Sequence, residues 1–596
     1  MYCRQNRKFS YFLLFATMLA VAAADEAQTN GQASGIPIDD PLTIAKCGGC
    51  HARDSAGIMR RLSFIRTTPE VWEQAIKRMV RLHGFNGTPE DTGKILRYLS
   101  KNNGLAPEEA KPVFWEAEHR RFRDQDDGTI TPAPLQTTCN TCHTVGRILG
   151  QRRTREDYQK LANMHMALFP YTEISIFRPY IGRATALAAV TTTTGMYSTD
   201  VSYPQPPKKP AKSPLDVALD YLAENQPLIT PEWTAWKSIM HTPDLSGAWL
   251  VNGFQKGKGR VYGQLTIEPA PIADEFLTKI ELRYANTGRV VKRTGKGIVY
   301  TGYSWRGRSK LGDPDPSTKD PNYAPPENKE AMLISRDGAS MQGRWFWGGY
   351  DEFGIDVQLS RLGKETVVFG TDAYSLRSPS TSELTVYGGG FAPALAPRDV
   401  DLGPGIKVLK VLQVTPTAAK LQVAVSEGLP DSVHDITIHG VSAVKAFAVY
   451  QKVAYIKVMP DASFARLGGT IAAKQYAQFE AVAFAAGPDG VPETADDVVL
   501  GPVTANWSLE EFYSTPDDDD VNYVGEINDS GLFTPSLEGP NPKRKKQANN
   551  LPTDNYGDVW VDASFTAPDG KLLKAKSFLV VGVPLYIHYD QPEVSQ

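Results

Sequence analysis

Cysteine is scarce in this chain, with five among 596 residues, and four of the five fall in two short motifs. This distribution excludes a disulfide-rich scaffold. Long apolar runs are also lacking, because none reaches the roughly 20 residues that a membrane-spanning helix requires. We therefore expect a mature chain without a membrane span.

A strong charge of one sign is missing as well, since the formal net charge is -3. A basic excess is the usual mark of a nucleic-acid-binding protein, so we expect no nucleic-acid partner. The sequence also contains no convincing P-loop, glycosidase carboxylate pair or catalytic triad. If a reaction centre exists, it is not visible among these motifs.

The N-terminus has the composition of an export signal. Three basic residues precede the apolar run from Tyr11 to Val21, and Ala22-Ala23-Ala24 follows it. This order predicts a cleaved signal peptide over residues 1–24 and export to the periplasm. Cys3 would leave with this peptide, so the mature chain would keep only the four motif cysteines.

Two Cys-x-x-Cys-His motifs, Cys47–His51 and Cys139–His143, are the most informative feature of the sequence. Such a motif is typical of covalent haem c attachment, in which two thiols join the porphyrin and the histidine binds the iron. We predict two haems, attached through Cys47, Cys50, Cys139 and Cys142, with His51 and His143 as proximal ligands. A four-cysteine zinc site is the alternative, but it needs no histidine after either pair.

An internal repeat surrounds the two motifs. Thr68–Gln74 matches Thr154–Lys160, and Leu96–Leu99 matches Leu219–Leu222. In each half the first segment would begin a helix and the second would lie in a closing helix. We therefore predict two tandem cytochrome c units within residues 25–240.

The repeat register predicts the distal haem ligands. Aligning Trp72 with Tyr158 puts Met79 opposite His165, which would give one His/Met haem and one bis-His haem of lower potential. His83 is the alternative to Met79, because it lies four residues later on the same helix face. The alternatives to His165 are its neighbours Met164 and Met166.

Arginines follow both motifs and would either neutralise haem propionates or form a solvated basic face. They are Arg60, Arg61, Arg66, Arg147, Arg152 and Arg153.

Beyond residue 240 short alternating runs and glycine turns predict antiparallel β domains. We expect a barrel-like domain over 241–372 and two immunoglobulin-like domains over 373–445 and 446–596. Two acidic runs lie in the last of these, Asp489/Asp496/Asp497 and Asp517–Asp520, and we favour solvated loops over calcium sites there. Lys543–Lys546 we expect to be an exposed basic loop or a docking surface.

The chain resembles the dihaem α subunit of quinohaemoprotein amine dehydrogenase over nearly all of its mature length. The resemblance rests on both haem motifs, the stretch around Met164-His165, and several further segments. These are Gly302–Gly307, Lys474–Val482, Trp507–Phe512, Gly531–Pro535, Gly539–Pro542 and Val583–Ile587. The chain departs from the family pattern in a longer insertion between His165 and Tyr221 and in a divergent region near Leu384.

The resemblance implies a periplasmic heterotrimer with a β-propeller β subunit and a small γ subunit that carries cysteine tryptophylquinone. It implies that the quinone oxidises primary amines to aldehyde and ammonia, while this chain passes the electrons through its haems to a blue copper protein or a cytochrome c. No catalytic residue is then expected on this chain. Two other readings remain open: a free-standing dihaem electron carrier for another dehydrogenase, and a dihaem peroxidase.

Overall fold

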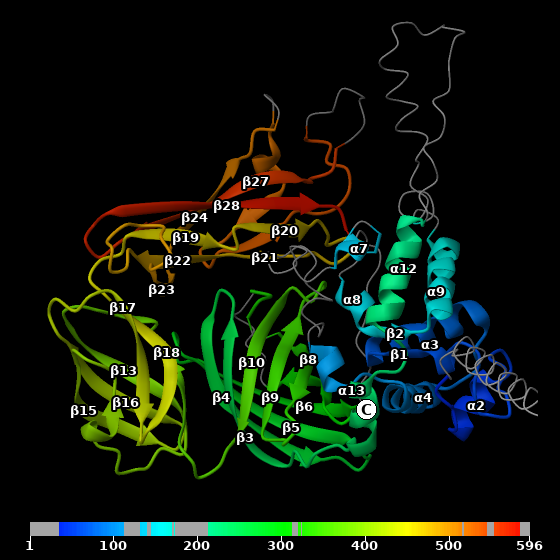
Figure 1. The fold of residues 1–596 in the computed structure, drawn as a ribbon. Helices are drawn as coiled ribbons and strands as arrows, with labels where there is room; N and C mark the ends of the chain where they lie inside the picture. The colour runs from blue at the N-terminus through cyan, green and yellow to red at the C-terminus, as the bar shows by residue number, and fades with distance from the viewer. Residues whose placement is uncertain are drawn as a thin grey trace, which may run out of the picture. The chain divides into compact units, whose positions relative to one another are not determined.

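The computed structural model describes residues 35–111, 132–136, 138–139, 145–169, 172, 212–312, 320–323, 325–514, 518–544 and 553–584. The expected signal peptide, the insertion before Tyr221 and the C-terminal Ile587 lie outside these residues. The chain divides into two compact units, a helical unit with most of residues 35–238 and a β unit with residues 239 onward. β structure predominates (Figure 1).

The helical unit is built from short helices and one two-stranded sheet. In chain order its elements are α2 (Pro41–Cys47), η1 (Leu62–Phe64), β1 (Ile65–Thr67), α3 (Pro69–His83), α4 (Pro89–Asn102), α7 (Ala133–Gln136), β2 (Gln151–Arg153), α9 (Arg155–Leu168), α12 (Pro214–Asn225) and α13 (Pro231–Ile239). Of the two remaining helices, α5 (Pro107–Ala110) is assigned to the β unit and α8 (Gly146–Leu149) is divided between the units. No helix among the described residues is long and apolar enough to cross a membrane.

Capping residues set where the longer helices begin. Thr88 accepts a hydrogen bond from the amide of Asp91 and completes a capping box at the start of α4. Thr154 and Ser213 accept the equivalent bonds at the starts of α9 and α12. Each cap satisfies a backbone N–H that has no partner inside the helix. At the other end of α3, Gly84 has φ 65°, the left-handed conformation that glycine adopts most easily.

A closed barrel of eight antiparallel strands begins the β unit (Figure 1). Its strands are β3 (Gly247–Gln255), β4 (Gly259–Pro269), β5 (Glu275–Tyr284), β6 (Val290–Tyr300), β7 (Ser304–Leu311), β8 (Glu327–Ile334), β9 (Ser340–Trp347) and β10 (Phe353–Arg361). β10 pairs with β3 and closes the ring. Burial alternates along β5, and Trp249, Trp305 and Trp345 are fully buried in the core. The sequence prediction of a barrel is therefore confirmed.

Two further groups of sheets follow the barrel. The first has two four-stranded sheets, β11-β13-β16-β15 and β12-β18-β17-β14, that share one hydrophobic core. Its strands are β11 (Val367–Thr371), β12 (Ser375–Arg377), β13 (Ser380–Gly389), β14 (Val400–Asp401), β15 (Ile406–Thr415), β16 (Ala418–Val425), β17 (Ser432–Ile438) and β18 (Val441–Tyr450); η5 (Pro397–Asp399) precedes β14.

The second group also buries a single core. Its sheets are β19-β22-β23, β20-β28-β27-β24 and β21-β26-β25. Its strands are β19 (Tyr455–Met459), β20 (Ala462–Arg466), β21 (Ala477–Gln478), β22 (Glu480–Ala485), β23 (Val498–Val503), β24 (Asn506–Glu511), β25 (Gly525–Ile527), β26 (Leu532–Pro535), β27 (Gly557–Thr566) and β28 (Leu572–Gly582), with η6 (Asp520–Asn522) before β25.

Strand pairing puts the junctions between the β regions at other positions than the sequence suggests. An end of the barrel at 372 would include β11, but β11 pairs with β13 of the next group. A boundary at 445 would cut β18, which pairs with β17 on both sides of it, through Val441–Ala443 and Phe447–Val449. The barrel therefore ends at Arg361 and the next group at Tyr450.

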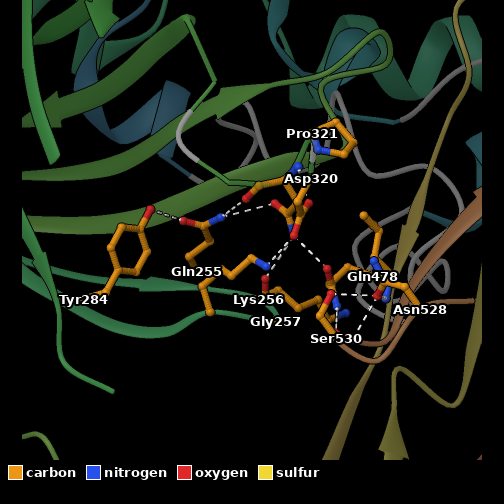
Figure 2. Close-up of polar contacts among 12 residues, drawn as sticks. Gln255, Lys256, Gly257, Tyr284, Asp320, Pro321, Gln478, Asn528 and Ser530 are labelled. Carbon is orange, nitrogen blue, oxygen red and sulfur yellow. Dashed lines mark hydrogen bonds and ion pairs between the residues drawn. The ribbon is translucent and has the colours of Figure 1, made fainter. Parts of the chain in front are cut away.

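Buried amides connect one end of the barrel to the last group of sheets (Figure 2). Tyr284 donates to the Gln255 side chain, whose amide in turn donates to the carbonyl of Asn322. Asn322 donates to the Gln478 side chain at 2.8 Å, and Gln478 donates to the carbonyl of Ser530 at 2.7 Å. Because an unpaired buried amide is costly, this continuous series of bonds holds the two regions in register.

Candidate haem sites

The first motif folds as a tight turn at the end of α2. Cys47 is the last residue of the helix, and its carbonyl accepts hydrogen bonds from the amides of Cys50 at 3.2 Å and His51 at 2.9 Å. A side chain at Gly48 would meet the carbonyl oxygen of Ile44 at 2.5 Å. The glycine thus permits the turn that brings both thiols and the imidazole into one segment of about one helical turn.

The ring of His51 is oriented by the backbone. Its Nδ1 lies 3.1 Å from the carbonyl oxygen of Arg60. A carbonyl can only accept, so Nδ1 carries the proton and Nε2 is the nitrogen with the lone pair. Metal-binding histidines are commonly oriented in this way. Burial is the main cause that lowers the pKa of His51, which favours the neutral ring that binds iron.

Helix α3 approaches the first motif with its C-terminal end. Arg61 and His83 both lower the pKa of His51 through their charges, so His83 lies within electrostatic range of the imidazole. Met79 shares this helix face one turn earlier and is half-buried, while His83 is exposed. Both candidates for the distal position therefore lie on one face of α3.

Only part of the second motif lies among the described residues. Cys139 donates its amide to the carbonyl of Leu135 at 2.9 Å, so the motif again follows directly on a helix, here α7. Cys142 and His143 lie outside the described residues. Burial raises the pKa of the Cys139 thiol to about 12 and that of Cys47 to about 11.

His165 on α9 is held in the same manner as His51. Its Nδ1 lies 2.9 Å from the carbonyl oxygen of Leu161, which makes Nδ1 the donor and Nε2 the basic nitrogen. The side chain is half-buried, and the ring of Phe169 lies 6.2 Å away between centroids. The ring therefore has the tautomer of an axial ligand.

The two halves of the helical unit repeat the same contacts in the register that the sequence suggests. Trp72 and Tyr158 are buried, each in the first turn of its helix. Trp72 donates from its indole nitrogen to the carbonyl of Asn103, and Tyr158 donates from its hydroxyl to the carbonyl of Gln226. Asn103 and Gln226 are the C-caps of α4 and α12. Each half thus ties the start of one helix to the end of the next.

The sheet between the halves follows the same register. β1 and β2 pair antiparallel, with Arg66 opposite Arg152 at the centre. These two arginines occupy equivalent positions in the repeat, so a local two-fold axis passes between them. It places Met79 and His165 at corresponding positions, each eleven residues after the threonine that caps its helix, Thr68 or Thr154.

Four family models match the chain in succession. They are described as Quinohemoprotein amine dehydrogenase A, alpha subunit, haem binding, at residues 39–180; alpha subunit domain II at 242–362; domain III at 366–451; and domain IV at 456–594. Together they span most of the sequence. The chain belongs to the quinohemoprotein amine dehydrogenase alpha subunit family. Its haem-binding region contains both Cys-x-x-Cys-His motifs, Met79 and His165.

Other comparisons add little to this family assignment. No curated protein matches the chain. Among solved structures, a redesigned β barrel is 14% identical and covers 20% of this chain and 92% of its own, with a TM-score of 0.16. The tryptamine complex of the amine binding protein of Rhodnius prolixus is 7% identical, with coverages of 20% and 66% and a TM-score of 0.16. Protocadherin Gamma C5 EC1-3 is 9% identical, covering 42% and 82%, with a TM-score of 0.14.

Several arginines of this alpha subunit have structural partners that the sequence did not suggest. Arg66 is fully buried, donates to the carbonyls of Leu228 and Gly104, and stacks over Trp233 at 4.8 Å. Arg152 and Arg153 are also buried. A solvated basic face is therefore wrong for these three residues. The signal that could have found them is their place directly before the helix caps, on the paired strands.

Proposed function

We propose that this chain is the electron-transfer and scaffold subunit of a periplasmic amine dehydrogenase and holds two covalent haems c. Membership of the alpha subunit family, with a haem-binding region that spans both motifs, is the observation that carries the proposal. Cys47, Cys50, Cys139 and Cys142 would hold the porphyrins. When bound, the haems supply one-electron redox chemistry.

The residues of the first motif suit this role. Cys47 and Cys50 lie in one turn of chain, and the carbonyl of Arg60 fixes His51 with Nε2 as the basic nitrogen. In the second half, Leu161 does the same for His165. We propose His51 and His143 as proximal ligands, and Met79 and His165 as distal ligands, in two cytochrome c units related by the observed repeat.

His83 is a second candidate for the first distal position, and one specific observation favours it. Its charge lowers the pKa of His51, so its imidazole is near the motif. Met79 rests on the repeat register instead, since it corresponds to His165. The two ligands give haems of different potential, because a thioether favours ferrous iron more than an imidazole does.

The remaining elements of the proposal concern the other subunits. We propose that a partner γ subunit carries cysteine tryptophylquinone, that a β-propeller subunit completes the complex, and that a primary amine leaves as aldehyde and ammonia. The two electrons would leave one at a time through this chain to a blue copper protein or a cytochrome c. The two groups of sheets after the barrel would be immunoglobulin-like scaffold domains.

The test is amine-dependent reduction of the haems in the purified complex. The full chain should co-purify with two further subunits, and addition of a primary amine under anaerobic conditions should reduce both haems. Alcohols of the same carbon skeleton are the matched control and should leave the haems oxidised. The proposal would be overturned if the chain purified alone and amines did not reduce its haems even when the proteins encoded by the neighbouring genes were present.

A further inference from the structure

Arg61 lies directly after the residue that orients the histidine of the first motif. The carbonyl of Arg60 accepts from Nδ1 of His51 at 3.1 Å, and it also accepts from the amide of Leu62 at 2.9 Å. Arg61 stands between these contacts and has φ 70°. This left-handed conformation is uncommon for a residue with a side chain, and it persists only where the surroundings hold it. What holds Arg61 therefore also holds the Arg60 carbonyl.

The side chain of Arg61 reaches out of its own half of the repeat. Its Nε lies 3.1 Å from Oδ1 of Asp157 on α9, as an ion pair. The other oxygen of this carboxylate pairs with Arg153. The side chains of Asp157 and Arg153 are 1% and 5% exposed, so water and salt screen this contact little. The ion pair thus fixes the loop after the first motif to the second half.

Asp157 connects the contact to the second haem site as well. It lies on α9 about two turns before His165, which we propose as the second distal ligand. The ion pair therefore joins the loop that carries the Arg60 carbonyl to the helix that carries His165. All of these residues belong to the helical unit.

The charges in this contact do not cancel. The guanidinium groups of Arg61 and Arg153 face one carboxylate, so a positive charge remains. This charge reaches the first motif, because Arg61 lowers the pKa of His51 through its charge, after burial as the main cause. Ferric iron carries one more positive charge than ferrous iron. A positive charge beside a haem therefore disfavours the ferric state and raises the reduction potential.

We propose that Arg61 and Asp157 are positioning residues for the first haem, an inference that rests on the proposed function of this chain. The ion pair holds the Arg60 carbonyl against His51, and the guanidinium keeps a positive charge beside this proximal ligand. Arg61 raises the potential of the first haem, and Asp157 limits the rise. The potential of the first haem thus depends on a side chain of the second half.

Spectroelectrochemical titration of the full chain with its haems attached tests the proposal. Arg61→Gln should lower the potential of the first haem, because it removes the positive charge. Asp157→Asn should raise this potential, because two guanidinium groups then lack their counter-charge. Arg61→Lys keeps the charge and should restore most of the potential. A purely structural role would not produce shifts of opposite sign.

Glu156→Gln is the matched control. It breaks the exposed ion pair between Glu156 and Lys160 on the same helix, and it should leave both potentials unchanged. The same titration in a background with Cys139→Ser and Cys142→Ser, which keeps only the first motif, assigns the shifted potential to the first haem.

The orienting role has a readout of its own. The ferric electron paramagnetic resonance spectrum of the first haem should change in Arg61→Gln, because the Arg60 carbonyl then fixes the plane of the His51 ring less firmly. Unchanged g values would reject this role.

The outcomes separate this inference from the proposed function. If both haems are attached but Arg61→Gln and Asp157→Asn shift the first potential in the same direction, or not at all, only the inference is overturned. A chain without haem at Cys47 and Cys50 overturns the proposed function too. If Asp157→Asn does not fold, an unchanged potential in Arg61→Gln, or an equal fall in Arg61→Gln and Arg61→Lys, rejects the inference.

Discussion

The two halves of the helical unit share a scaffold and differ where the haem chemistry would be decided. In both, a buried aromatic at the start of one helix donates to the C-cap carbonyl of the next, through Trp72 in the first half and Tyr158 in the second. The amides of Thr67 and Arg153 add a second bond to the same carbonyls. At the position that these contacts align, the first half has Met79 and the second has His165. A duplicated framework therefore carries two different side chains at one aligned position, the two that we propose as distal ligands.

The halves also differ in buried charge. Asp157 of the second half is 1% exposed and pairs with Arg153 and with Arg61, which reaches it from the loop after the first motif. Val71 is the equivalent residue of the first half. Arg61 has φ 70°, a left-handed conformation that is unusual for a side chain other than glycine. The second half thus has a buried ion pair at the position where the first half has the half-buried Val71.

The largest expected effect comes from removing one attachment motif. The chain matured with a haem-attachment system should carry two haems by intact mass, and Cys47→Ser with Cys50→Ser should carry one. Each motif belongs to its own half of the repeat, so the second haem should still attach. Cys139→Ser with Cys142→Ser is the reciprocal control. An unchanged chain with one haem or none would contradict the two-haem proposal.

Changing the distal residues tests the difference at the aligned position. His165→Ala should leave the second haem high-spin, while the first keeps the absorption of a thioether-bound ferric iron. Met79→Ala should abolish that band and lower the potential of the first haem, because axial ligands set haem potentials over a range of about 0.8 V. His83→Ala is the comparison variant. If it perturbs the first haem and Met79→Ala does not, the repeat register misassigns the ligand and both haems are bis-His.

Much of this comparison was accessible from the sequence, because local patterns produced it. The repeat appears in short matching segments, and alternating burial along strands such as β5 predicts the barrel. Contacts between distant segments were not accessible. By its sequence context Arg66 resembles a surface residue. In the structure it lies on β1, which pairs with β2, and its guanidinium donates to the carbonyl of Leu228. Arg544 belongs to a basic run by sequence, yet it is buried against Asp520. Such pairs depend on loops whose paths no periodicity describes.

Breaking the buried ion pair of the second half should lower the free energy of unfolding more than breaking an exposed ion pair on the same helix. Asp157→Asn leaves Arg153 buried without its charge partner, and loss of one partner of a buried pair costs about 3–5 kcal/mol in the free energy of unfolding. Urea unfolding of the full chain, followed through the haem absorption, measures the change. Glu156→Gln is the control, since Glu156 pairs with Lys160 on the exposed face of the same helix. Its expected loss is below about 1 kcal/mol. Equal losses in the two variants would mean that the buried ion pair stabilises the chain no more than the exposed one does.

The smallest expected effect concerns the hydroxyl of Tyr158. It lies 3.1 Å from the carbonyls of both Gln151 and Gln226, and Tyr158→Phe removes this donor while keeping the ring. We expect a loss of about 1–2 kcal/mol, because a buried hydrogen bond is lost without a cavity. Trp72→Phe in the first half removes the indole donor and also part of the ring, so it should cost more, about 2–4 kcal/mol. The same urea titration compares them. If Tyr158→Phe is the more costly of the two, the hydroxyl and not the ring volume holds the second half together, and the equivalence of the two anchors fails.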